Sequence, residues 1–82
     1  MSAIDLDVAH AASMRHRTQL LKSELCGCFY CLSQFTPSEI NAWCDEGDTA
    51  LCPRCGIDSV IGSASGYSIT REFLEAMNGR WF

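Results

Sequence analysis

The sequence lacks the features that mark membrane and secreted proteins. No apolar run approaches the roughly 20 residues that a helix needs to cross a bilayer, and no lipidation motif is present. No apolar stretch typical of a secretory leader follows Met1, because residues 2–7 are short and acidic. We therefore expect a protein of the cytoplasm, where paired cysteines bind metal more often than they form disulfides.

Basic residues are also scarce. Six Lys and Arg stand against ten Asp and Glu, which gives a net charge of −4. Residues 25–66 contain five acidic side chains and Arg54 as their one basic side chain, whereas both flanking segments are neutral. This balance argues against a general attraction to phosphate backbones, which usually requires a basic face.

Residue patterns typical of catalysis are missing. No histidine follows His16, no serine stands in a nucleophile motif, and the carboxylates around Gly47 are more typical of a solvated acidic turn. A thiol oxidoreductase of the thioredoxin type would require a βαβ pattern and a longer chain. The sequence therefore predicts a protein that is not an enzyme.

Cysteine, in contrast, is abundant, with six in 82 residues. Four of them form two Cys-x-x-Cys pairs separated by twenty residues: Cys28, Cys31, Cys52 and Cys55. Each pair can wrap a turn, or knuckle, that points both sulfurs at one tetrahedral ion, so two pairs complete a closed shell of four thiolates. We predict one structural Zn²⁺ there. A domain of this size has a thin core, and structural zinc can supply on the order of 10 kcal/mol.

Two cysteines and both histidines remain outside this set. Cys26 fits the spacing less well than Cys28, and Cys44 is expected to be a buried thiol on an apolar helical face. A second metal bound by Cys26, Cys44, His10 and His16 stays open as an alternative, although the spacing of these residues is irregular.

Helix signals flank the cysteine pairs. Asp5 and Asp7 can cap a first helix over residues 8–24, which no Pro or Gly interrupts. Thr70 can cap a last helix over residues 70–80, whose apolar stripe is expected to dock on the rest of the core and which leads into Trp81 and Phe82.

The zinc module itself spans residues 26–62. Thr36, Pro37 and Glu39 predict a capped helix that ends near Asp45. Residues 49–51 and 57–61 are expected to form a hairpin with the second knuckle at its tip, and a short helix after Cys55 is the alternative. Residues 62–66 form a loop.

Residues 26–82 resemble a group of small, uncharacterised bacterial cytoplasmic zinc-binding proteins whose treble-clef module is distantly similar to that of HNH endonucleases. The likeness is carried by Cys28-Phe29-Tyr30-Cys31, Phe35, residues 37–40, Trp43, residues 50–62, Phe73-Leu74 and Trp81-Phe82. It implies the four cysteine ligands and a treble-clef fold. The HNH nucleases place a catalytic histidine between their two knuckles, and this chain has none there, so the resemblance implies no nuclease activity.

The sequence thus predicts one small α+β domain over residues 1–82, built on a treble-clef or zinc-ribbon module with a helix at each end. Its expected function is that of a non-catalytic cytosolic adaptor or regulator that binds a protein partner. The alternative is a nucleic-acid-binding zinc protein that uses its basic first helix. The candidate contact residues for either partner are Arg15, Arg17, Lys22, Arg54, Trp81 and Phe82.

Overall fold

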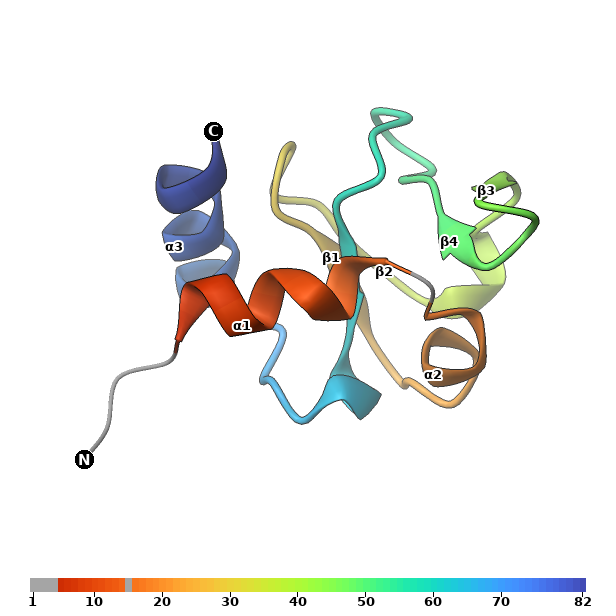
Figure 1. The fold of residues 1–82 in the computed structure, drawn as a ribbon, viewed down its shortest axis with the longest axis horizontal. Helices are drawn as coiled ribbons and strands as arrows, with labels where there is room; N and C mark the ends of the chain where they lie inside the picture. The colour runs from red at the N-terminus through yellow and green to blue at the C-terminus, as the bar shows by residue number, and fades with distance from the viewer. Residues whose placement is uncertain (1–4, 15) are drawn as a thin grey trace.

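The computed structural model describes residues 5–14 and 16–82 and confirms the small α+β fold class, with four cysteines close together. Three α-helices and five short strands follow one another in this part of the chain (Figure 1). The helices are α1 (Leu6–His10), α2 (Arg17–Leu21) and α3 (Arg71–Trp81). The strands are β1 (Cys26–Cys28), β2 (Gln34–Phe35), β3 (Trp43–Cys44), β4 (Thr49–Ala50) and β5 (Val60–Gly62). Single 3₁₀ turns lie at Ala11–Ser13, Pro37–Glu39 and Ser63–Ser65.

The centre of the fold is an antiparallel sheet in the order β2-β1-β5. Cys26 of β1 lies opposite Phe35 on one side and Gly62 on the other. Because successive side chains of a strand point to opposite faces, Cys26 and Cys28 share one face and Gly27 lies on the other. The sheet therefore separates two hydrophobic clusters.

The cluster on the cysteine face contains the metal-ligand candidates and the side chains that surround them. A second small antiparallel pair, β3 with β4, covers it together with α2. Its buried members are Leu20, Cys26, Cys28, Phe35, Ile40, Ala50, Cys52 and Val60.

The cluster on the opposite face is formed by α1 and α3. Its buried members are Ala9, Phe29, Ile61, Ile69, Phe73, Leu74 and Met77. Helix α3 and the segment before it come so close to β1 that a Cβ atom at Gly27 would lie 2.8 Å from Cγ2 of Ile69 and 2.9 Å from Leu74. Only glycine permits this approach, so Gly27 sets the distance between the helix and the sheet.

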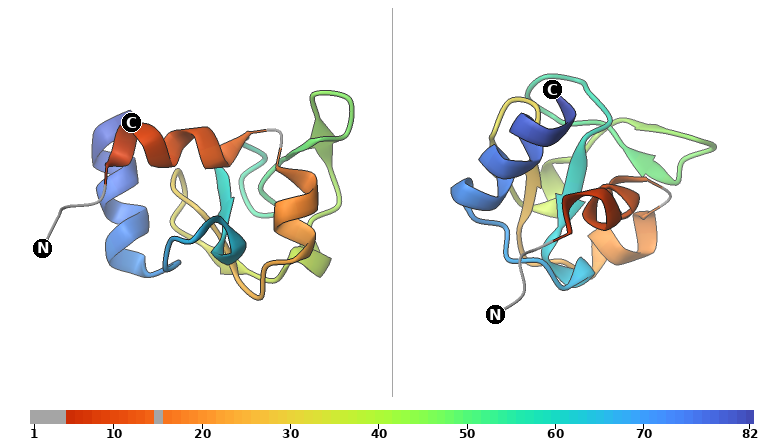
Figure 2. Two further views of the ribbon diagram at one scale, coloured as in Figure 1. Left: turned by 60° about the horizontal axis from the view of Figure 1, so that its bottom comes forward. Right: turned by 60° about the vertical axis from the view of Figure 1, so that its left-hand side comes forward.

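The predicted continuous helix over residues 8–24 is wrong. The chain forms α1 and a 3₁₀ turn, then leaves the helical conformation at Met14 and begins α2 at Arg17 (Figure 2). The backbone amides of His16 and Arg17 both donate to the carbonyl of Asp48, at 2.8 and 3.0 Å, and so cannot continue a helix. A contact with a residue more than thirty positions away therefore overrides the local helix propensity.

The predicted internal helix is also shorter than expected. The capping box forms, since the Thr36 amide donates to the Glu39 carboxylate at 2.8 Å, but only a 3₁₀ turn follows and Trp43 and Cys44 lie in β3. Nor do residues 49–51 and 57–61 pair with each other: β4 pairs with β3, and β5 pairs with β1. Residues 56–59 contain no helix, so the alternative short helix after Cys55 does not form either.

The last helix follows the sequence closely. The Thr70 hydroxyl accepts a hydrogen bond from the amide of Phe73 at 3.1 Å, and the predicted apolar stripe is buried at Phe73, Leu74 and Met77. Within the part of the chain that the structure describes, no helix combines the length and the apolar character needed to cross a membrane.

Candidate metal centre

Cys28, Cys31, Cys52 and Cys55 converge as the sequence predicts. Their four sulfur atoms lie within 4.8 Å of one another, and two separations between the knuckles are 3.6 Å, from Cys28 to Cys55, and 3.7 Å, from Cys31 to Cys52. A tetrahedron with Zn–S bonds of about 2.3 Å has sulfurs about 3.8 Å apart. All six cysteines, which lie in the described part of the chain, are free thiols. The four sulfurs can therefore hold one metal ion.

The two knuckles are built alike. In each, the amide two residues after the first cysteine donates to its sulfur: Tyr30 to Cys28 at 3.4 Å and Arg54 to Cys52 at 3.3 Å. The backbone amide of the residue four positions after that first cysteine donates to the cysteine's carbonyl. The cysteine's own amide donates to the carbonyl of the residue five positions after it. The same bonds in both turns aim backbone dipoles at the sulfurs, which favours their ionised form.

The residue after each second cysteine adopts a left-handed conformation. Gly56 has φ 80°, and Leu32, at the matching position of the first knuckle, has φ 65°. Glycine adopts this region without cost, whereas leucine does so only where the surrounding structure holds it there. Leu32 packs against the cluster around α3, and this packing holds the first knuckle in its turn.

The thiol pKa values at this site and the repulsion between the thiolates make a cation necessary for all four to ionise. Burial raises the pKa of Cys28, and burial together with the nearby thiols raises the pKa of Cys55 to about 12. Burial also acts to raise the pKa of Cys31, but hydrogen bonds from Ser33 and from neighbouring thiols outweigh it and lower that pKa to about 7. Four thiolates at these distances repel one another strongly, so all four ionise together only around a positively charged ion.

The metal-ligand candidates differ in their contact with solvent. Cys28 and Cys52 are buried, and the Cys28 sulfur also lies 3.3 Å from the Ser59 hydroxyl. Cys31 and Cys55 are half-buried. Four protein sulfurs occupy every position of a tetrahedral ion, so this geometry suits a structural site with no place for water or substrate.

The remaining cysteines and histidines do not assemble a second centre within the described residues. Cys26 is fully buried, and burial raises its pKa to about 11. The His10 ring packs on Trp81 with centroids 4.1 Å apart.

His16 has a structural role that the sequence did not indicate. Its Nδ1 lies 2.7 Å from the Ala12 carbonyl, which assigns the proton to Nδ1, and its Nε2 accepts the amide of Ala50 at 3.1 Å. Burial lowers the pKa of this imidazole. His16 thus joins the N-terminal segment to β4, two residues before Cys52, as a neutral ring.

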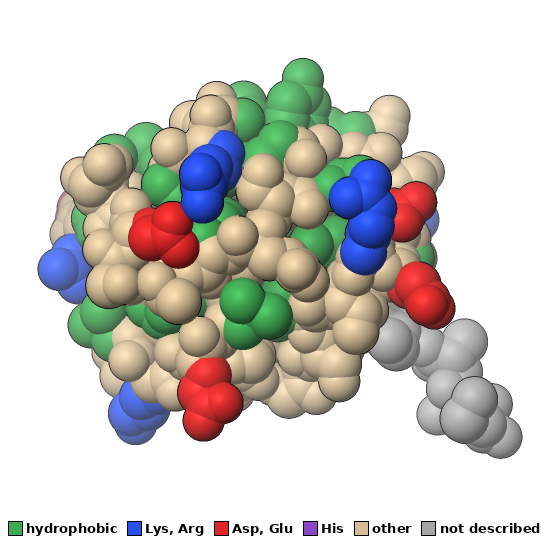
Figure 3. Space-filling model, turned by 180° about the vertical axis from the view of Figure 1, so that it is seen from behind, with side chains coloured by type: hydrophobic (Ala, Val, Ile, Leu, Met, Phe, Trp, Pro, Cys, Tyr) green, Lys and Arg blue, Asp and Glu red, His purple; other side chains and the backbone are tan. Residues whose placement is uncertain are grey.

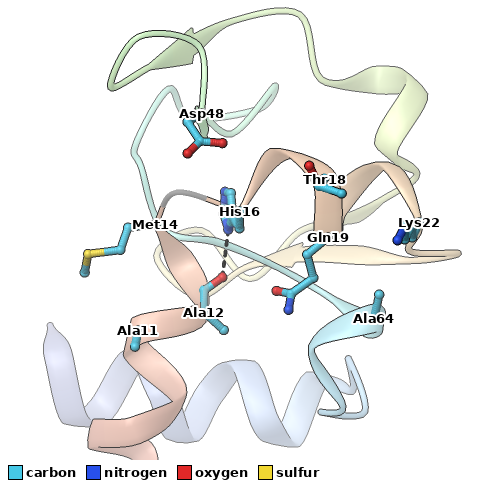
Figure 4. Close-up of a pocket in the computed structure, with 9 residues that line it drawn as sticks. All are labelled: Ala11, Ala12, Met14, His16, Thr18, Gln19, Lys22, Asp48 and Ala64. Carbon is cyan, nitrogen blue, oxygen red and sulfur yellow. Dashed lines mark hydrogen bonds between the residues drawn. The ribbon is translucent and has the colours of Figure 1, made fainter.

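An open hollow of about 620 Å³ lies beside His16, between the end of the first helical segment and α2 (Figure 4). Small side chains and residues of both charges line it: Ala11, Ala12, Met14, Thr18, Gln19, Lys22, Asp48 and Ala64. The His16 nitrogens are both occupied, so this lining offers no free imidazole for acid-base chemistry.

The candidate basic contacts are dispersed, and two of them are already engaged. Arg17 donates to the Gly47 carbonyl at 2.9 Å and lies 4.5 Å from the centroid of the Trp43 ring, while Arg54 forms an ion pair with Glu39 at 3.0 Å. Lys22 is exposed, and Arg15 lies outside the described residues. On the face shown in Figure 3 the basic side chains stand apart from one another, and acidic ones lie beside two of them.

The aromatic contacts predicted at the C-terminal end are partly exposed. Trp81 is 37% exposed and Phe82 is 60% exposed. Tyr30 of the first knuckle, 48% exposed, packs on Phe82 with ring centroids 4.8 Å apart. Tyr30 is not among the contact residues that the sequence predicts. Its neighbour Phe29 is the buried ring, and Tyr30 belongs to a surface that the fold creates.

Comparison of the chain with protein-family models, with curated proteins and with solved structures gave no match. The assignment of the site therefore depends on its geometry alone.

Proposed function

We propose that this protein is a non-catalytic, zinc-dependent binding module of the cytoplasm that acts as an adaptor or regulator by engaging a protein partner. The observation that carries the proposal is the closed set of four sulfurs beside an exposed aromatic surface. The metal holds the fold, and the surface makes the contact.

Zinc is the metal that this donor set favours. Thiolates are soft ligands that select Zn, Cu(I) or Fe–S clusters over Mg and Ca, and the spacing of the sulfurs suits a single tetrahedral ion. With all four positions filled by protein, the ion supplies charge neutralisation and cross-linking of the chain.

A protein partner fits the surface better than nucleic acid does. Arg17 and Arg54 make internal contacts, and the net charge is negative, so no basic face attracts phosphate among the described residues. Exposed aromatic side chains are instead enriched in protein interfaces.

Photo-crosslinking in native lysate tests the proposal. A benzophenone amino acid at Tyr30 should give a discrete crosslinked protein that the same probe at Thr18, exposed on α2, does not give. In parallel, the zinc-loaded protein is titrated with DNA and RNA at low salt. Absence of any protein adduct, together with tight and salt-sensitive binding to nucleic acid, would refute the proposed function in favour of a nucleic-acid partner.

A further inference from the structure

Three exposed aromatic side chains lie where the first knuckle touches the end of α3. We call Tyr30, Trp81 and Phe82 the aromatic platform. Behind it, Phe29 lies 5.9 Å from the Phe82 ring, and His10 lies 4.1 Å from Trp81, between ring centroids. The rings of Tyr30 and Phe82 are in direct contact, and the half-buried His10 and the buried Phe29 connect them to Trp81. The knuckle loop and the C-terminal end of α3 lie side by side in Figure 1 and in the right-hand view of Figure 2.

Specific bonds fix the platform in place. Asn78 of α3 donates from Nδ2 to the carbonyls of Phe29 and Tyr30, both at 3.1 Å. Trp81 donates from Nε1 to the Leu6 carbonyl at 3.1 Å, which anchors the indole to α1. Since Tyr30 stands between two ligand candidates, Cys28 and Cys31, the platform is complete only when the first knuckle is folded.

The size of the platform selects the kind of partner. An aromatic side chain offers about 150–250 Å², so the observed exposures leave roughly 300 Å² of aromatic surface open. A standard interface between globular proteins, including a dimer of this chain, needs about 800 Å² from each partner. The platform is too small for that and large enough for two or three side chains of a short peptide.

The charged side chains beside the platform further restrict the kind of peptide that it can bind. Two charged side chains beside the platform, Asp7 and Arg80, pair with each other at 2.7 Å, and the Arg80 guanidinium lies 5.0 Å from the centroid of the Trp81 ring. With these two side-chain charges paired, the side chains of the platform offer apolar and aromatic contacts and no charged group of their own.

We propose that the aromatic platform binds a short peptide segment of a partner protein through aliphatic or aromatic side chains, and that the metal centre is required for this binding because it shapes the knuckle that carries Tyr30. This inference rests on the proposed function and specifies the partner's chemistry.

The test begins with selection from a phage-displayed library of random 12-residue peptides on the zinc-loaded protein. Enriched peptides should share aliphatic or aromatic residues without a common charge. A synthetic copy of the most enriched peptide is then titrated by calorimetry. Phe82→Ala and Tyr30→Ala should each weaken its binding at least tenfold, whereas Leu21→Ala, which shortens a 61% exposed side chain on α2, should leave it unchanged.

Zinc content and thermal unfolding are measured for every variant. Because the platform is changed at two positions, a folding defect in one of these variants leaves the other to test the inference. Removal of zinc with a chelator should abolish peptide binding. The inference is overturned if no peptide is enriched on the folded zinc protein, if the enriched peptide binds both platform variants as tightly as the parent, or if sedimentation shows a self-association that Phe82→Ala removes. A partner that the probe at Tyr30 still crosslinks in the Phe82→Ala variant would leave the proposed function standing and exclude the platform as its site.

Discussion

The two kinds of cysteine allow the metal centre to be tested within one chain. Cys52→Ala removes a ligand candidate, and Cys26→Ala removes a fully buried thiol on the same face of the sheet that lies outside the ligand set. Structural zinc contributes about 10–16 kcal/mol in small zinc domains. An 82-residue domain has a net stability of roughly 4–12 kcal/mol on the usual per-residue scale. Loss of the ion therefore removes more stabilising free energy than the folded domain has as net stability.

The expected outcomes differ in kind. Cys52→Ala should lose zinc and show no cooperative thermal transition by circular dichroism. Cys26→Ala should keep one zinc per chain by native mass spectrometry, and a loss of about 1 kcal/mol for one buried heavy atom lowers Tm by about 4–8 °C. Cooperative unfolding of Cys52→Ala near the parent Tm would refute the reasoning, as would loss of zinc from Cys26→Ala or two disulfides in the native protein.

Four further substitutions test three features of the structure. Gly56→Ala places a side chain at φ 80° with no atom within 4 Å of the new Cβ, so backbone strain alone should lower the free energy of unfolding by about 1–2 kcal/mol. Gly79→Ala, inside α3 and equally uncrowded, should raise the free energy of unfolding by about 0.5–1 kcal/mol. Urea unfolding measures both values, and two changes of the same sign would contradict this reasoning. Asn78→Ala should cost about 1–2 kcal/mol without loss of zinc, and an unchanged urea midpoint would show that its two bonds to the knuckle add nothing. Burial lowers the pKa of His16 in the folded state, whereas in the unfolded chain this imidazole has a pKa of about 6.5. Between these two pKa values the unfolded chain binds more protons than the folded chain does. The free energy of unfolding should therefore fall as the pH drops below about 6.5, by up to about 1.4 kcal/mol per pH unit, until the pH is below the folded pKa. In His16→Gln, the urea midpoint should depend less on pH between pH 7.5 and 5. An equal dependence of the urea midpoint on pH in parent and variant would assign this dependence to the thiolates.

The features that the sequence predicts well depend on local chemistry. The two Cys-x-x-Cys spacings fix both sulfurs of each turn, and Thr70 caps α3 through the amide of Phe73 three residues later. Each of these needs only a few neighbouring residues to be satisfied. The ligand set and the last helix can therefore be identified from the amino-acid sequence alone.

The features that the sequence does not predict depend on distant partners. The first helix breaks because the Asp48 carbonyl takes two of its amides, and the helix after Thr36 stops because Trp43 pairs with Ala50 and stacks on Arg17. Such contacts form only when these segments come together in the folded chain. Local propensity contains no information about them.

The three residues of β1 place the metal centre and helix α3 back to back. The side chains of Cys26 and Cys28 lie in the cluster around the candidate metal centre, and Gly27 receives the helix on the other face. Neither cluster can lose its packing without exposing the strand that the other also uses, so the two layers should open as one cooperative unit in hydrogen exchange. A metal ion held by the four cysteines should therefore protect amides that lie on the far side of the sheet and make no contact with the ion.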